Sequence, residues 1–165
     1  MEFQRANLER LKNAFIEQME RYSEPDFVQT LRYNRRVDDQ MLQSDFERYS
    51  KSVARDFTDR NYRRKLKGCP AFVGFVQGEN KSLSTHIHVG VWVPADKSPY
   101  PVCRMDSYAQ PAWKSVAGLH AEVWTSWSYG NHKSYAWYYQ RELTSCDEHS
   151  IRMVEYNLEN ARMLS

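Results

Sequence analysis

The chain has few cysteines and no long apolar run. Its 165 residues include three cysteines, Cys69, Cys103 and Cys146, and no two of them form a Cys-x-x-Cys pair. This spacing suggests neither a zinc knuckle nor a disulfide framework, and it favours a reducing compartment. No apolar run approaches the roughly 18 residues of a membrane span, and the first residues contain no apolar signal segment. We therefore expect a cytoplasmic protein that has no membrane partner.

Glycine and proline are also sparse, at six residues each. The chain has neither a glycine-rich phosphate loop nor a Gly-x-Ser-x-Gly motif, which argues against P-loop, kinase and α/β-hydrolase functions. The formal net charge is only +2, so no polycationic field for nucleic acid is expected. Apolar residues make up 41% of the chain, which is enough for one core. We expect one domain over residues 1–165.

Hydrophobic periodicity predicts an α+β protein. Apolar residues at helical spacing predict an N-terminal helix, a second helix and a C-terminal helix at about 5–22, 38–57 and 147–162. Runs of β-forming residues predict strands at 27–33, 71–76, 85–93 and 121–127. The remaining predictions are a loop at 94–111, a short helix at 112–116 and a further helix at 135–143. This order predicts a two-layer sandwich, in which helices cover a central antiparallel sheet.

His86 and His88 are the most informative residues of the sequence. Only Ile87 separates them in a β-branched run, so both imidazoles should project from one face of a strand. Two neutral imidazoles provide half of a divalent metal site. An oxygen from Gln77, or alternatively from Glu79, would give a ligand set that suits Mg²⁺ or Mn²⁺. The alternative is a pair of histidines on the solvent face of an amphipathic strand.

A second candidate for chemistry is the aromatic-rich segment 135–143. Tyr138 and Arg141 are three residues apart and share one face of the predicted helix. A phenol oxygen can attack phosphorus, and a guanidinium one turn away can stabilise the added negative charge. Tyr139 is a rival nucleophile if the helix phase differs by one residue, and Tyr156 is a second rival. The alternative is an aromatic helix without catalytic function.

Aromatic and basic residues near these motifs form a candidate surface for single-stranded nucleic acid, because aromatic rings stack bases and cations follow the backbone. The candidates are Arg32, Arg35, Arg36, Arg63, Arg64, Trp124 and Trp127. Some of the tryptophans are expected to belong to the core, and a charge run at a helix end is usually only solvated.

Three motifs, in this order, resemble those of the HUH (His-hydrophobe-His) endonucleases, which include rolling-circle replication initiators, relaxases and related transposases. The first is Gln29–Arg35, the second is His86–His88 and the third is Tyr138–Leu143. The resemblance covers about residues 27–143 and is strongest to the compact single-tyrosine initiators of bacterial plasmids and filamentous phages. It implies a ferredoxin-like sandwich whose sheet presents both histidines, on the second arm of a hairpin, to a metal ion.

The same resemblance implies a metal-dependent enzyme that nicks and rejoins single-stranded DNA. Tyr138 would remain bound to the 5′ phosphate and leave a free 3′ hydroxyl. The implied partners are single-stranded DNA or a DNA hairpin, together with host replication proteins. Arg141 stands where the family usually has lysine, and Gln77 stands where it often has glutamate. The alternative is a nuclease-dead protein of the same fold that binds nucleic acid or a protein partner as a regulator or inhibitor.

Overall fold

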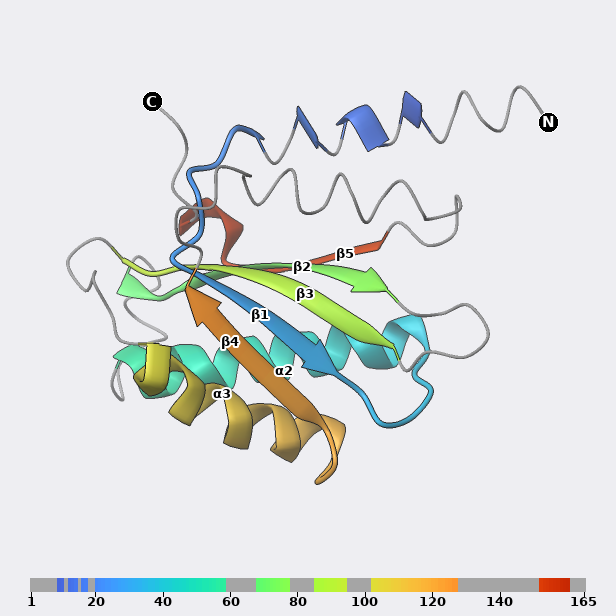
Figure 1. The fold of residues 1–165 in the computed structure, drawn as a ribbon, viewed down its shortest axis with the longest axis vertical. Helices are drawn as coiled ribbons and strands as arrows, with labels where there is room; N and C mark the ends of the chain where they lie inside the picture. The colour runs from blue at the N-terminus through green and yellow to red at the C-terminus, as the bar shows by residue number, and fades with distance from the viewer. Residues whose placement is uncertain are drawn as a thin grey trace.

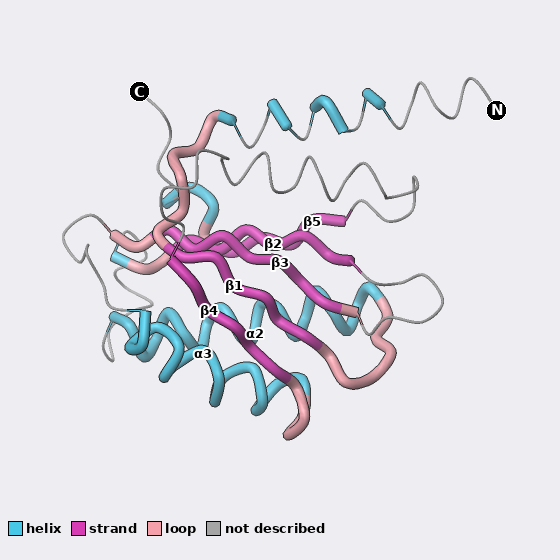
Figure 2. Tube along the Cα trace, viewed as in Figure 1, coloured by secondary structure: helices cyan, strands magenta, loops and turns pink. Residues whose placement is uncertain are grey.

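A computed structural model of the chain describes residues 9–10, 12–14, 16–17, 20–58, 68–77, 85–94, 102–127 and 152–160. The elements, in chain order, are β1 (Phe27–Arg32), α2 (Asp39–Thr58), β2 (Ala71–Gln77), β3 (His86–Trp92), α3 (Val102–Ala117), β4 (Glu122–Trp127), β5 (Arg152–Tyr156) and the 3-10 turn η4 (Leu158–Asn160). The described residues from 9 to 17, and Glu20, are helical as well, as predicted for the N-terminal segment. The α+β class is confirmed (Figures 1 and 2).

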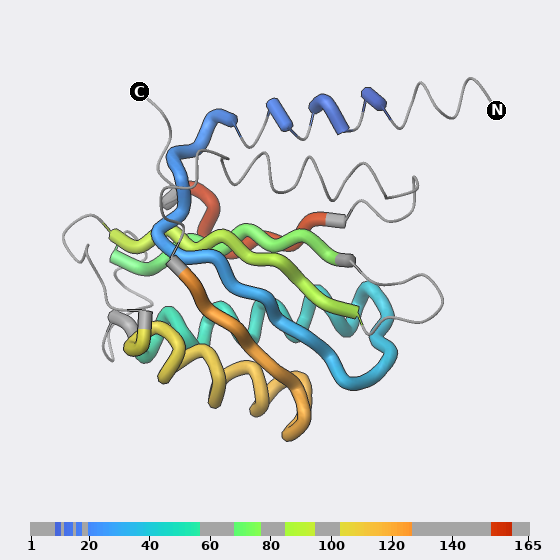
Figure 3. Tube along the Cα trace, viewed as in Figure 1, coloured from blue at the N-terminus to red at the C-terminus, as the bar shows by residue number. Residues whose placement is uncertain are grey.

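The strands form one five-stranded sheet in the order β4-β1-β3-β2-β5. All four pairings between neighbouring strands are antiparallel. β3, which carries both histidines, is the central strand and lies between β1 and β2. Figure 3 shows that the two edge strands, β4 and β5, come from the later part of the chain. The histidines therefore have neighbouring strands on both sides.

Alternate residues of each strand belong to two different faces of the sheet. α2 and α3 cover one face, here called the helix face, and the N-terminal residues lie on the other side of the sheet (Figure 1). The helix face contributes buried residues such as Leu31, Ile87 and Val89 to the main core. The opposite face carries His86 and His88 and is here called the histidine face.

α2 forms where its capping and its periodicity agree. Asp38 accepts a 2.8 Å hydrogen bond from the backbone N–H of Met41, which satisfies one of the free donors of the first turn. Apolar residues then recur at steps of four, three and four and are buried against the sheet: Leu42, Phe46, Tyr49 and Val53. The predicted helix over about 38–57 is therefore confirmed.

The prediction of a loop over residues 94–111 is wrong for residues 102–111, because α3 already begins at Val102 and continues through Pro111. A proline inside a helix removes one backbone hydrogen bond, which made a helix here improbable from sequence. Met105, Ala109 and Trp113 are nevertheless buried at steps of four in the main core. Burial of this apolar stripe offsets the cost of the proline.

The predicted C-terminal helix over 147–162 is also wrong where the structure describes it, over residues 152–160, since residues 152–156 form strand β5 at the edge of the sheet. β5 pairs with β2, so that Val154 lies opposite Gly74 and Tyr156 lies opposite Phe72. Val154 is buried, and its burial follows a period of two rather than of a helix. Pairing with β2 gives hydrogen-bond partners to the backbone N–H and C=O groups of β5. The spacing of apolar residues within one segment does not reveal such a partner strand.

Candidate functional site

The two histidines are close neighbours on the histidine face. Their ring centroids are 4.9 Å apart, and their ring planes are nearly perpendicular at 87°. Ile87, between them, is fully buried in the core on the other face. The prediction that His86 and His88 project from one face of a strand is therefore confirmed.

His88 lies in a row of side chains that are directly opposite one another on neighbouring strands. Thr30 of β1 lies opposite it on one side and Phe75 of β2 on the other. Thr30 Oγ1 is 3.1 Å from His88 Nδ1, which is hydrogen-bond distance. The side chain of His88 is only 7% exposed, whereas His86 is partly exposed. The second histidine is thus held in a packed position, and the first is nearer to solvent.

His86 lies in the next row of opposed side chains, and this row includes charged residues. Arg32 of β1 and Gln77 of β2 lie opposite it. A terminal guanidinium nitrogen of Arg32 is 3.7 Å from a carboxylate oxygen of Glu122 on β4, and both side chains are about half exposed. Such an exposed pair adds little stability. The β1–β3 register places the cation of Arg32 one strand away from His86.

The separation of the two histidine rings is short enough for both to contact one cation, and it is also that of an ordinary edge-to-face ring contact. Two imidazole nitrogens bound at about 2.1 Å to one ion would place their ring centroids about 4.5 Å apart at a right angle and about 5.2 Å apart at the tetrahedral angle. The observed separation of 4.9 Å lies between these two values. Among the described residues, no group of three or more His, Cys, Asp or Glu side chains could hold a metal. Gln77 has its backbone beside His86, but its side chain and all of Glu79 lie outside the described residues.

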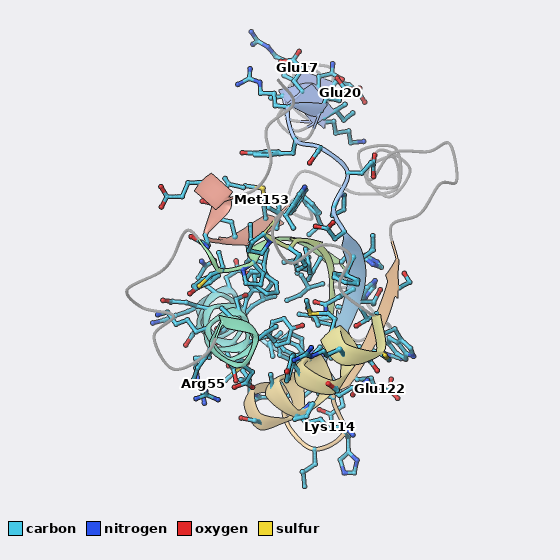
Figure 4. All side chains as sticks on the ribbon, turned by 90° about the vertical axis from the view of Figure 1, so that its left-hand side faces the viewer. Glu17, Glu20, Arg55, Lys114, Glu122 and Met153 are labelled. Atoms are coloured by element: carbon cyan, nitrogen blue, oxygen red, sulfur yellow. The ribbon has the colours of Figure 1, made fainter. Side chains whose placement is uncertain are left out.

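Trp124 shares the row of His88. It lies opposite Thr30, which in turn lies opposite His88, so two strand spacings of together about 10 Å separate Trp124 from His88. The side chain of Trp124 is 51% exposed. β4, the strand of Trp124, is an edge strand: Figure 4 shows Glu122 of β4 and Met153 of β5 at opposite sides of the sheet. Because Trp124 is half exposed and in register with Thr30 and His88, it offers an aromatic surface on the same face as the histidines.

Arg35 has a structural partner that the sequence did not reveal. Its guanidinium is 3.7 Å from Asp45 of α2, and Arg48 is 3.9 Å from the same carboxyl group. Asp45 is buried, and burial raises the pKa of its carboxyl group although both arginines act to lower it. Tyr33 is buried beside them, and burial followed by the charge of Asp45 raises the pKa of its phenol. Arg35 therefore contacts α2, while the neighbouring Arg36 is exposed.

The structure separates Tyr156 from the histidines. Tyr156 pairs with Phe72 on the helix face, where the two ring centroids are 6.2 Å apart, and it packs against the main core. Trp127 pairs with Phe27, and its side chain lies outside the described residues. The other predicted site residues outside the described part are Arg63, Arg64, Tyr138, Tyr139 and Arg141.

Comparison with known proteins found no match: no protein-family model, no curated protein and no solved structure is significantly similar to this chain. Within the described part of the chain, no helix has the length and apolar character needed to cross a membrane.

Proposed function

We propose that the chain is a metal-dependent endonuclease of the HUH type, which nicks and rejoins single-stranded DNA for a plasmid, phage or other mobile element. The observation that carries this proposal is the pair His86 and His88, 4.9 Å apart on one face of the central strand of an antiparallel sheet. A ferredoxin-like arrangement, with the histidines on the second arm of a hairpin, and action in the cytoplasm are parts of the same proposal.

The chemistry is a transesterification at phosphorus. A bound Mg²⁺ or Mn²⁺ ion, held by His86 and His88 with Gln77 or Glu79, would polarise the scissile phosphate. The oxygen of Tyr138 forms a bond to phosphorus, and its proton passes to solvent. The bond from phosphorus to the 3′ oxygen breaks, and that oxygen takes up a proton to become a hydroxyl group. Arg141 stabilises the added negative charge, and the reverse reaction rejoins the strand.

The histidine face also offers contacts for the DNA strand. Arg32 lies one strand from His86, where its charge suits a phosphate next to the scissile one. Trp124 lies two strands from His88, and its exposed ring suits stacking of a neighbouring base. Arg32 and Trp124 are thus the described cation and aromatic ring that support binding of single-stranded DNA.

The test is covalent trapping. The full chain is incubated with circular single-stranded DNA and Mn²⁺, and the product is analysed on a denaturing gel and by mass spectrometry. We expect a protein–DNA adduct that EDTA, Tyr138→Phe or the double change His86→Ala and His88→Ala prevents. His120→Ala, an exposed histidine before β4, is the matched control and should retain the adduct.

The outcomes separate the alternatives. An adduct that survives Tyr138→Phe but disappears in Tyr139→Phe would reassign the nucleophile. The absence of any adduct from the wild-type chain would overturn the enzymatic proposal. If that chain still bound single-stranded DNA, and the double histidine variant bound it equally well, the nuclease-dead regulator would be the better description.

A further inference from the structure

We propose that Thr30 is a positioning residue for His88: its hydroxyl oxygen accepts the hydrogen of Nδ1 and leaves Nε2 as the nitrogen that binds a divalent cation. The binding of a cation by Nε2 rests on the proposed function, whereas the hydrogen bond between Thr30 and His88 does not. The observation is the 3.1 Å distance between Thr30 Oγ1 and His88 Nδ1. It joins two residues that are 58 positions apart in sequence but directly opposite in the β1–β3 register.

The surroundings of His88 make this contact effective. Thr30 on β1 and Phe75 on β2 flank the ring, and the ring is almost completely buried. A β-branched threonine has restricted rotation about its first side-chain bond, so the position of its hydroxyl is well defined. A weakly solvated ring depends on protein partners to select its tautomer, because little water competes for Nδ1.

The tautomer decides whether the ring can bind a cation. A neutral imidazole carries one N–H and one lone pair, on different nitrogens. If Thr30 accepts from Nδ1–H, the lone pair is on Nε2; if the Thr30 hydroxyl instead donates to Nδ1, the hydrogen is on Nε2 and that nitrogen cannot be a ligand. Metal-binding histidines usually donate their other ring hydrogen to a neighbouring oxygen, and loss of that oxygen typically weakens metal binding about 10–100-fold.

Two substitutions separate the hydroxyl from the shape of the side chain. Thr30→Val keeps the branched shape and removes the acceptor, whereas Thr30→Ser keeps the hydroxyl. Thr125→Val is the matched control, because Thr125 is on the neighbouring strand β4 but its hydroxyl contacts Gln29 on the helix face. Urea unfolding shows whether each variant folds, and Thr30→Ser keeps the inference testable if Thr30→Val does not.

The first readout needs neither metal nor activity. Nitrogen-15 spectra of the metal-free chain, with His88 assigned from its loss in His88→Ala, report which ring nitrogen carries the hydrogen. We expect Nδ1–H in the wild type, in Thr30→Ser and in Thr125→Val, with a loss of this preference in Thr30→Val. An Nε2–H tautomer in the wild type, or an unchanged tautomer in Thr30→Val, would overturn the inference.

The second readout is the affinity for Mn²⁺ alone, measured by calorimetry. We expect Thr30→Val to bind Mn²⁺ about 10–100-fold more weakly than the wild type, and Thr30→Ser to bind it nearly as well. Equal affinity of Thr30→Val and the wild type would refute the positioning role while leaving the metal site intact. If the wild type bound no Mn²⁺, the proposed function would fail at its metal, and the tautomer measurement would still decide the role of Thr30.

Discussion

The hydroxyl of Tyr49 donates a 2.7 Å hydrogen bond to Oε1 of Gln29, and both side chains are completely buried between α2 and the sheet. The amide nitrogen of Gln29 reaches Thr125 Oγ1 at 3.3 Å. Burial raises the pKa of Tyr49, so its phenol keeps the hydrogen that it donates. Gln29 is thus a polar core residue with partners on both ends of its amide, next in sequence to Thr30 on the opposite face.

Tyr49→Phe should destabilise the fold by about 1–3 kcal/mol, because the buried carbonyl oxygen of Gln29 loses its donor. Urea unfolding monitored by circular dichroism measures this change. The matched comparison is the double variant Tyr49→Phe with Gln29→Leu, which removes both partners and should recover part of the loss. Strictly additive effects of the two single changes would contradict the energetic coupling that we expect from this hydrogen bond.

Gly74→Ala should destabilise the fold by about 1–3 kcal/mol through overpacking. A Cβ at Gly74 would approach Ile87 Cγ2 to 2.7 Å and Val154 Cγ2 to 3.0 Å, between β3 and β5. Gly68→Ala is the control, because a Cβ there meets nothing within 4 Å. Thermal or urea unfolding of both variants tests the prediction. Similar stabilities of the two variants would show that the sheet does not require a glycine at position 74.

Asp45→Asn should change how stability depends on pH. Burial raises the pKa of the Asp45 carboxyl group, so the folded chain binds this proton more tightly than the unfolded chain. The wild type therefore loses stability as the pH rises from about 4 through the folded pKa, whereas the asparagine variant lacks this contribution. The stability of Asp45→Asn relative to the wild type should increase over that range.

Urea unfolding of both chains between pH 4 and pH 7 measures this difference. Asp56→Asn, at an exposed carboxylate of the same helix, is the matched control. A difference between Asp45→Asn and the wild type that stays constant with pH would contradict the prediction. It would mean that Arg35 and Arg48 balance the burial of the Asp45 charge.

Trp124→Ala should weaken binding of a single-stranded oligonucleotide by about 1–3 kcal/mol, the value of one base stacked on an aromatic ring. Fluorescence anisotropy in EDTA measures this affinity without cleavage. Leu119→Ala removes another exposed apolar side chain, 82% exposed in the turn before β4, and should leave the affinity unchanged. Equal affinities of Trp124→Ala and the wild type would exclude Trp124 from the proposed DNA-binding surface.

Local pattern was sufficient for much of the fold. Capping by Asp38 and the apolar stripe of α2 made that helix predictable, since both signals depend on residues within one or two turns. The strands β1 to β4 were predictable from runs of β-forming residues. The shared face of His86 and His88 follows from the period of two in any strand, whatever its partners are.

Local pattern failed where distant partners decide the structure. β5 exists because the edge of β2, about 80 positions earlier, pairs with it, and its apolar residues alone fitted a helix equally well. α3 contains Pro111, and only burial of Met105 and Trp113 against the sheet explains why the helix continues through it. The position of Tyr156 on the helix face follows from its pairing with Phe72.

The sequence by itself determined that two imidazoles share one face of a strand, because the alternation of side chains is a property of a single extended backbone. Only the tertiary structure decided which residues surround them. Thr30 and Arg32 lie beside the histidines because β1 pairs with β3 in one register. Arg35 contacts Asp45 because α2 packs against the helix face of the same sheet. Register and packing depend on contacts between distant segments, and a pattern of neighbouring residues does not contain them.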